Sequence, residues 1–323
     1  MATTYRMYTD DDIDDLVKFW SDNSGWDQID RTEWERRFHH TPYGKATVAL
    51  AIKKNEIVGQ FVFIPTVISI DGKEVKAFRP FAPVVKESLR SALGMATLIE
   101  IIFKMYNYAI DHFRLKGISL VHMLPDPRWV RGFRFLSDIQ IGDFPLWSIS
   151  LPTKEKFVLP DGYEVEPINA TDEKIDLLWA KNSRLYGCSL PRNTQTLSWK
   201  TSHGDYKLVG IFYQGELVGL STSTVKEKDK QWLICDMISS DGDETLLAII
   251  KATCNAAHDF VTSQTGTAVE KAAILATALI EKNIKQLGFK KEKYKFPIVV
   301  QLLDPKLSKQ QVAPERWYAS AND

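Results

Sequence analysis

The sequence is poor in cysteine and contains no metal-binding motif. Three cysteines, Cys188, Cys235 and Cys254, occur among 323 residues, and none of them is spaced as CxxC. An odd number without such a pair argues against a disulfide framework and against a zinc site. The six histidines form no HExxH motif, so no metal is predicted. The thiols are interpreted as free groups of a reducing compartment, and a cytoplasmic protein is expected.

Net charge and long apolar segments are absent as well. Lysine plus arginine and aspartate plus glutamate both number 41, so no excess of positive charge predicts binding to nucleic acid or to an anionic membrane. The first residues, MATTYRMYTDDD, have no apolar signal core. The apolar runs carry charges and fall short of the roughly 20 residues that a membrane span needs. We therefore expect no nucleic-acid and no membrane partner.

What the sequence does contain is an internal repeat. Three pairs of segments match in the same order: FWSDNS (19–24) with LWAKNS (178–183), NEIVGQFVFI (55–64) with GELVGLSTST (215–224), and IQIGDFPLWSI (139–149) with KEKYKFPIVVQ (291–301). Agreement at three places in one order indicates a duplicated unit. The length of 323 residues also favours two domains.

Each copy shows the same order of expected elements. A strand and a helix come first, then a two-strand hairpin, a further strand, a long helix and closing strands. The hairpin turns are predicted at Lys54-Asn55 and at Gln214-Gly215. The long helices are expected over 91–115 and 243–263, where apolar residues recur at helical spacing.

The segment LPTKEKFVLPDG (151–162) separates the two copies. Its prolines and glycine are typical of a linker. We therefore expect a first domain over 1–150, a second domain over 163–303 and a C-terminal tail over 304–323.

This order of elements resembles the GNAT superfamily of N-acetyltransferases, in two tandem copies that cover nearly the whole chain. The resemblance implies an α/β fold of the mixed α+β type, in which each copy has a splayed central sheet flanked by helices. It also implies acetyl-CoA as acyl donor. The family binds the pyrophosphate of that molecule on a loop written Q/R-x-x-G-x-G/A, between its fourth strand and the next helix. Residues 90–96 read RSALGMA, which fits with the arginine shifted by one position.

Backbone amides at a helix N-terminus are unpaired and attract anions, and a glycine lets a phosphate approach closely. The residues expected to hold the cofactor are Val84, Val85, Arg90, Ser91, Ala92, Leu93, Gly94, Met95 and Ala96. The alternative is an ordinary helix start with Arg90 in solvent. The second copy has Asp241, Asp243 and Glu244 at the corresponding turn. Because these carboxylates would repel a diphosphate, only the first copy is expected to bind acetyl-CoA.

The chain departs from the family pattern where acid–base chemistry is concerned. Phe133 falls near the place of the tyrosine that the family commonly uses as acid. His122, on the strand expected over 118–124, and Asp126 are the candidate catalytic residues, since a histidine transfers protons near neutral pH. The alternatives are a histidine bonded within the sheet and an aspartate that caps the next helix.

Arg79, Trp26 and Trp129 are the candidate substrate-binding residues. Arg79 lies on the expected fourth strand and is suited to an acidic substrate or a coenzyme A phosphate. The tryptophans are suited to an acceptor cleft. The alternatives are a surface ion pair for the arginine and core packing for the aromatic rings.

The resemblance implies an N-acyltransferase that acetylates a primary amine of a small molecule or an amino sugar. Because the family tyrosine is missing, a non-catalytic module that binds acyl-CoA or a protein partner is the alternative. A relative that transfers aminoacyl groups from tRNA is a third possibility, and the neutral charge argues against it.

Overall fold

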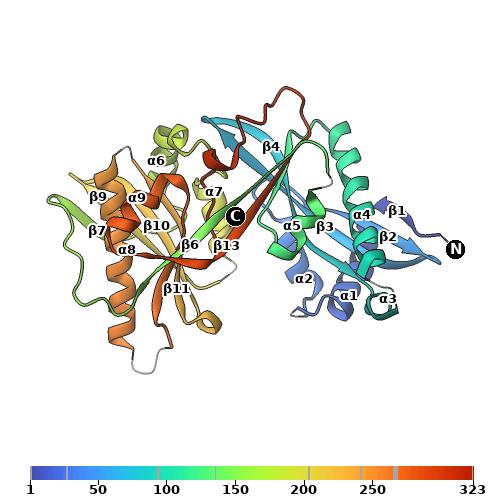
Figure 1. The fold of residues 1–323 in the computed structure, drawn as a ribbon, viewed down its shortest axis with the longest axis horizontal. Coiled ribbons are helices and arrows are strands. Elements are labelled where there is room, and N and C mark those ends of the chain that lie inside the picture. The colour runs from blue at the N-terminus through green and yellow to red at the C-terminus, as the bar shows by residue number, and fades with distance from the viewer. Residues whose placement is uncertain are drawn as a thin grey trace.

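The structure is a computed structural model that describes residues 2–323 except 27, 93–94, 135, 203, 241, 265–267 and 322, and the side chains of 91–97 are also outside the description. Within these residues one mixed sheet runs through the whole molecule, and helices cover both of its faces (Figure 1). No helix in the described part of the chain is long and apolar enough to cross a membrane.

The strands of the first half are β1 (Thr4–Met7), β2 (Thr47–Lys53), β3 (Glu56–Ile70), β4 (Lys73–Val85), β5 (Leu120–Met123) and β6 (Ile139–Ser150). Those of the second half are β7 (Tyr163–Pro167), β8 (Cys188–Ser189), β9 (Tyr206–Tyr213), β10 (Glu216–Lys226), β11 (Gln231–Ser239), β12 (Lys271–Leu275) and β13 (Lys290–Leu302). The α-helices are α1 (Ile13–Asn23), α2 (Arg31–Trp34), α3 (Glu87–Ala92), α4 (Met95–Leu115), α5 (Pro127–Phe133), α6 (Lys174–Asn182), α7 (Thr194–Thr201), α8 (Asp243–Ser263) and α9 (Ala278–Gln286). Short helical turns are η1 (Asp10–Asp12), η2 (Glu35–His39), η3 (Ser183–Tyr186), η4 (Glu227–Asp229) and η5 (Pro314–Arg316).

The repeated hairpins form as predicted. β2 pairs with β3 and β9 pairs with β10, both antiparallel. Lys54 and Asn55 have φ values of 53° and 60°, and Gln214 and Gly215 have values of 51° and 80°. Two successive residues with positive φ form the tight turn whose twist suits a two-residue hairpin.

The two halves exchange their last strands. The sheet order is β1-β2-β3-β4-β5-β13-β6-β12-β11-β10-β9-β7, with β8 paired to β3. β13, the final strand of the second half, lies between β5 and β6 of the first. β6 in turn pairs with β12 of the second half. β6 and β13 run antiparallel next to each other at the centre of Figure 1. Each half therefore completes the sheet of the other.

Helices bury the faces of the sheet on either side of this crossing. α4 places apolar residues one turn apart, including Ile101, Met105 and Ala109, against β2 and β3. The opposite face of the same strands carries α1 and α2 through Leu16, Trp20 and other buried residues. In the second half α8 and α6 pack on β10 and β11.

The three cysteines are all buried and unpaired. Burial raises the pKa of Cys188, Cys235 and Cys254 to about 12 in each case. They are therefore protonated, unreactive thiols that serve as small core residues.

Candidate active site

A split in the sheet of the first half creates a cavity. β4 and β5 run parallel, but they are paired only at Ala77↔Leu120 and Phe78↔Val121. Pro80 and Pro83 follow on β4, and a proline has no N–H to donate to a ladder. Ala82, between them, has a positive φ of 50°, and the register with β3 shifts at this point. The bulge turns β4 away from β5, so the sequence RPFAP itself opens the sheet.

The cavity in this split has a volume of about 390 Å³. Its wall comes from the segment after α1, from β3, β4, α4, β5 and the segment after it, and from α5, β13 and the C-terminal tail. The lining residues are Trp26, Phe61, Arg79, Pro80, Phe81, Ala82, Pro83, Ile102, Phe103, Tyr106, Met123, Leu124, Pro125, Asp126, Trp129, Phe133, Phe296, Ala321 and Asp323. The wall is mainly aromatic and apolar, with few ionisable groups. Such a composition is typical of a site for an organic ligand.

Four of the residues singled out from the sequence meet in this cavity. Trp26, Arg79, Asp126 and Trp129 all line it. They come from the segment after α1, from β4, from the segment after β5 and from α5, so only the fold brings them together. The main-chain oxygen of Asp323 accepts a hydrogen bond from Arg79 Nη1 at 2.6 Å.

Asp126 lines the cavity and also caps a helix. Its carboxylate accepts a hydrogen bond from the backbone N–H of Arg128 at 2.9 Å, and it binds the Arg128 guanidinium at 2.9 and 3.0 Å. These bonds to the side chain and backbone of Arg128 lower the pKa of Asp126. The capping alternative raised by the sequence therefore holds in the structure.

His122 lies outside the cavity. On β5 its neighbours Val121 and Met123 pack toward α4, whereas the histidine faces the other side, with its ring 5.7 Å from the ring of Trp317. It is 3% exposed, and Nε2 is 3.1 Å from the hydroxyl of Thr66. Burial, followed by the charge of Arg79, lowers its pKa to about 3. His122 is therefore not among the residues that line the cavity, and its catalytic role stays a prediction.

The predicted cofactor loop is only partly described. Leu93 and Gly94 lie outside the described residues, as do the side chains of Ser91, Ala92, Met95 and Ala96. Val84 and Val85 are buried at the end of β4. A short helix, α3, stands between β4 and α4, which the sequence did not predict.

Arg90 is exposed at the end of α3. Its Nη2 donates to the main-chain oxygen of Asn23 at 2.8 Å, and the Asn23 side chain accepts from the backbone N–H of Glu87 at 2.9 Å. The end of α1 is thereby fixed to α3. The predicted role of Arg90 toward a diphosphate stays a prediction.

Sequence reasoning missed several residues of the wall. Phe61, Phe103 and Tyr106 face the cavity from β3 and α4, but apolar spacing alone did not separate them from core residues. The hydroxyl of Tyr106 donates to Gln301 Oε1 of β13 at 2.8 Å, and burial raises its pKa. Phe133, at the place of the family tyrosine, also lines the cavity.

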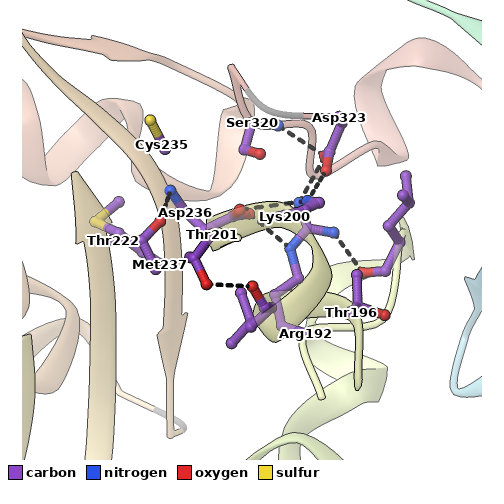
Figure 2. A network of polar contacts seen from close by, with 12 residues as sticks. Arg192, Thr196, Lys200, Thr201, Thr222, Cys235, Asp236, Met237, Ser320 and Asp323 are labelled. Carbon is purple, nitrogen blue, oxygen red and sulfur yellow. Dashed lines mark hydrogen bonds and ion pairs between the residues drawn. The ribbon is translucent and has the colours of Figure 1, made fainter. Parts of the chain in front are cut away.

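A buried ionic network holds the tail beside the cavity (Figure 2). Arg192 binds Asp236 at 3.0 Å and Asp323 at 2.6 Å, and Lys200 binds the same two carboxylates at 3.3 and 2.5 Å. All four side chains are between 0% and 4% exposed. Burial alone would raise the pKa of Asp323, but the charges of Arg192 and Lys200 lower it by more, so the net pKa lies well below its usual value.

The corresponding split of the second half is filled by the chain itself. β11 and β12 are paired only as far as Ile234↔Ile274. Beyond that point the hydroxyl of Tyr318 accepts from the Met237 N–H at 2.9 Å and donates to its carbonyl at 2.8 Å. The hydroxyl of Tyr186 does the same for Ser239, at 2.5 and 3.1 Å. Two tyrosines thus satisfy the free strand edge that in the first half faces a cavity.

Each half of the chain thus has two parallel strands that separate part-way along the sheet. Solved structures with the same arrangement show which fold this is. A conserved protein of unknown function from Enterococcus faecalis V583, a probable N-acyltransferase, matches with a TM-score of 0.66 at 9% identity over 94% of this chain and 73% of that chain. A GCN5-related N-acetyltransferase from Anabaena variabilis matches with a TM-score of 0.67 at 12% identity over 94% and 73%.

A tandem GNAT protein from the clavulanic acid biosynthesis pathway matches with a TM-score of 0.59 at 11% identity, over 94% of this chain and 99% of that chain. No protein-family model and no curated protein matches the sequence. The chain therefore has the GNAT N-acetyltransferase fold in tandem form, as the sequence predicted, and at these identities the likeness concerns the fold.

Proposed function

We propose that this chain is an N-acyltransferase, which transfers an acetyl group from acetyl-CoA to a primary amine of a small molecule or amino sugar. The cavity between β4 and β5 carries this proposal. It is an apolar slot beside an unpaired strand edge in a GNAT fold, and the equivalent slot of the second half is filled by Tyr186 and Tyr318. Because the cavity is open in the first half and filled in the second, we expect each chain to bind one acetyl-CoA, in the first half.

The wall fits the slender, mostly apolar arm of coenzyme A better than its phosphates. Phe61, Phe103 and Trp129 supply rings on two sides, and the bulge at Ala82 interrupts the β-ladder, so that strand backbone groups near it are available to a bound amide or thioester oxygen. When bound, the donor supplies an acyl group activated as a thioester. The chain's own contribution is to enclose and orient that group and to exclude water.

The described ionisable groups of the wall offer little acid–base catalysis near neutral pH. The pKa of Asp126 is lowered by Arg128, that of Asp323 is lowered by Arg192 and Lys200 against burial, and that of Tyr106 is raised by burial. We therefore propose that the acceptor amine reaches the site already deprotonated. The same observation favours the second candidate function, a module that binds acyl-CoA without turning it over.

Calorimetric titration with acetyl-CoA tests the donor site. We expect binding by the unsubstituted protein and loss of binding in Leu124→Trp, which puts a large ring into the cavity. Leu177→Trp is the control, because Leu177 is 72% exposed on α6. The site would be refuted if the unsubstituted protein gave no heat of binding, or if Leu124→Trp and Leu177→Trp gave the same heat. Coenzyme release with a panel of amines then separates an enzyme from a binding module, since only the enzyme releases free thiol.

A further inference from the structure

The cavity in the split reaches from one face of the sheet to the other. On the side of α4 its wall includes Tyr106 and Phe133, which belong to the core beneath that helix. On the side of α1 and α2 it includes Phe81 and Trp26, whose rings pack on Trp20 of the other core. Two molecules can therefore meet inside the split, one from each face.

The end of the cavity next to α1 and α2 is the one that an acceptor would use. The loop expected to hold the diphosphate leads into α4, so the donor of the proposed function reaches the split from the face that α4 covers. An acceptor then has to enter from the opposite face, past Trp26 and Phe81. We call this part of the cavity the acceptor end.

Aromatic rings form the acceptor end. The ring centroids of Trp26 and Phe81 are 5.9 Å apart, and both rings also contact Trp20, at 5.1 and 6.3 Å. Phe81 packs on Phe38 as well, at 5.8 Å. Trp26 is nevertheless 54% exposed, whereas tryptophan is highly buried on average. A ring that is held by its neighbours and keeps a free face is suited to stacking on a flat apolar group.

The charged groups of the wall are already engaged with protein partners. The carboxylate of Asp126 is bound to Arg128, and that of Asp323 is bound to two cations of the buried network. Arg79 donates to the main-chain oxygen of Asp323 at 2.6 Å. These three groups therefore offer no free opposite charge to a ligand, and burial of a ligand's carboxylate or phosphate without one is costly.

The wall also offers few hydrogen-bond partners to a ligand with many hydroxyls. Pro80, Pro83 and Pro125 have no backbone N–H, and the hydroxyl of Tyr106 already donates to β13. Each sugar hydroxyl that leaves water without a new partner costs free energy. A single amine is easier to accommodate, because β4 is paired with β5 only as far as Phe78 and main-chain oxygens beyond that point can accept its N–H groups.

We propose that the acceptor is an arylalkylamine, a primary amine carried on a flat aromatic body that has no acidic group and no row of hydroxyls. Its ring stacks on Trp26 and Phe81, and its amine points through the split to the thioester. The inference rests on the proposed acyl transfer and narrows its substrate class. Amino sugars and amino acids are then poor acceptors.

Three primary amines that differ in the rest of the molecule test this assignment. The protein would be saturated with coenzyme A, which has no acyl group to transfer, and titrated calorimetrically with phenethylamine, phenylalanine and glucosamine. Phenylalanine differs from phenethylamine only by a carboxylate, and glucosamine carries hydroxyls in place of the aromatic ring. We expect phenethylamine to bind at least tenfold more tightly than either of the others. A smaller preference, or the reverse order, overturns the proposal.

Substitutions of Trp26 test where the aromatic ring binds. Trp26→Ala should reduce the affinity for phenethylamine about tenfold, because it removes one stacking face, and Trp26→Phe should retain most of that affinity. Tyr108→Ala is the control, since Tyr108 is 42% exposed on α4 and does not line the cavity. Equal affinities of Trp26→Ala and Tyr108→Ala would refute the assignment.

The donor site is measured separately, by titrating each variant with coenzyme A before any amine is added. Trp26 lies at the acceptor end, so Trp26→Ala should bind coenzyme A as the unsubstituted protein does, which also shows that the variant is folded. Weaker phenethylamine binding with intact coenzyme A binding supports the acceptor site. Absence of coenzyme A binding in the unsubstituted protein refutes the proposed function itself, and the acceptor assignment with it.

Discussion

At the scale of single residues, the carboxylate of Asp323 joins several buried cations. It is 4% exposed and binds both Arg192 and Lys200, while its main-chain oxygen binds Arg79. One residue of the tail thus touches a cation of the first half and two of the second. A buried charge without its partners is strongly destabilising.

Asp323→Ala should lower the free energy of unfolding by about 3–5 kcal/mol, because it leaves Arg192 and Lys200 with only Asp236 between them. Urea denaturation followed by tryptophan fluorescence measures this. Asp143→Ala is the control: it breaks an ion pair with Lys295 whose side chains are about half exposed, and it should cost less than about 1 kcal/mol. Similar losses for the two variants would contradict a structural role of the network.

Four of the candidate site residues named from the sequence line the cavity. Trp26, Arg79, Asp126 and Trp129 were recognisable because they flank elements that the sequence also predicts. His122 lies on the strand predicted for it, but alternation along a strand puts neighbours on opposite faces and does not say which face lines the cavity. Asp323 carried no signal, since an aspartate in a polar tail becomes a cavity residue only when the tail folds back.

At the scale of elements, β5 carries a histidine whose neutral form the fold requires. Its pKa is about 3 in the folded protein because of burial, against about 6.5 in the unfolded chain. Between these values the unfolded state binds a proton that the folded state excludes. The contribution of His122 to the free energy of unfolding is therefore fully present above about pH 6.5. It falls by about 1.4 kcal/mol for each pH unit below that value.

His122→Gln should remove that dependence, because glutamine does not titrate and retains a group able to bond Thr66. Between about pH 6 and pH 5, the free energy of unfolding of the variant should change less steeply with pH than that of the unsubstituted protein. Urea titrations at several pH values measure both slopes. Identical slopes would mean that the imidazole is accessible to protons in the folded state.

The sequence predicted those helices and turns that are determined by residues close together in the chain. The bounds of α8 coincide with the expected 243–263, and both hairpin turns lie where the sequence placed them. The pairing of strands was not predicted. Alternation indicates which residues form a strand, but the choice of β5 as the neighbour of β13 depends on residues nearly 180 positions apart.

At the scale of the whole molecule, the exchange of β6 and β13 makes the halves interdependent. β6 forms one long ladder with β13 and a second with β12, and β13 also pairs with β5. The segment 151–162 joins the halves covalently, but it lies along α8 through contacts such as the Asn255 side chain with the Phe157 backbone. The covalent link is therefore not what keeps the halves together.

Cleavage of that segment should leave the molecule intact. A specific protease site inserted between Lys154 and Glu155, which are both exposed, allows the cut. After cleavage the two fragments should co-elute as one species in gel filtration and should separate only in denaturant, because the pairs of β13 with β5 and β6, the pair of β6 with β12 and the hydrogen bond from Arg79 to Asp323 all join one fragment to the other. Elution as two separate species would show that the sheet is not shared as described.

The crossing of the last strands also says what one copy would do alone. The edge of its fifth strand would be unpaired, and its own last strand could pair with that edge in an identical molecule. Such a unit is self-complementary about a twofold axis. A single copy is thus expected to form a symmetric homodimer in which each molecule supplies the last strand of the other. In the fused chain the two halves need not be alike, and only the second has its split closed by tyrosines.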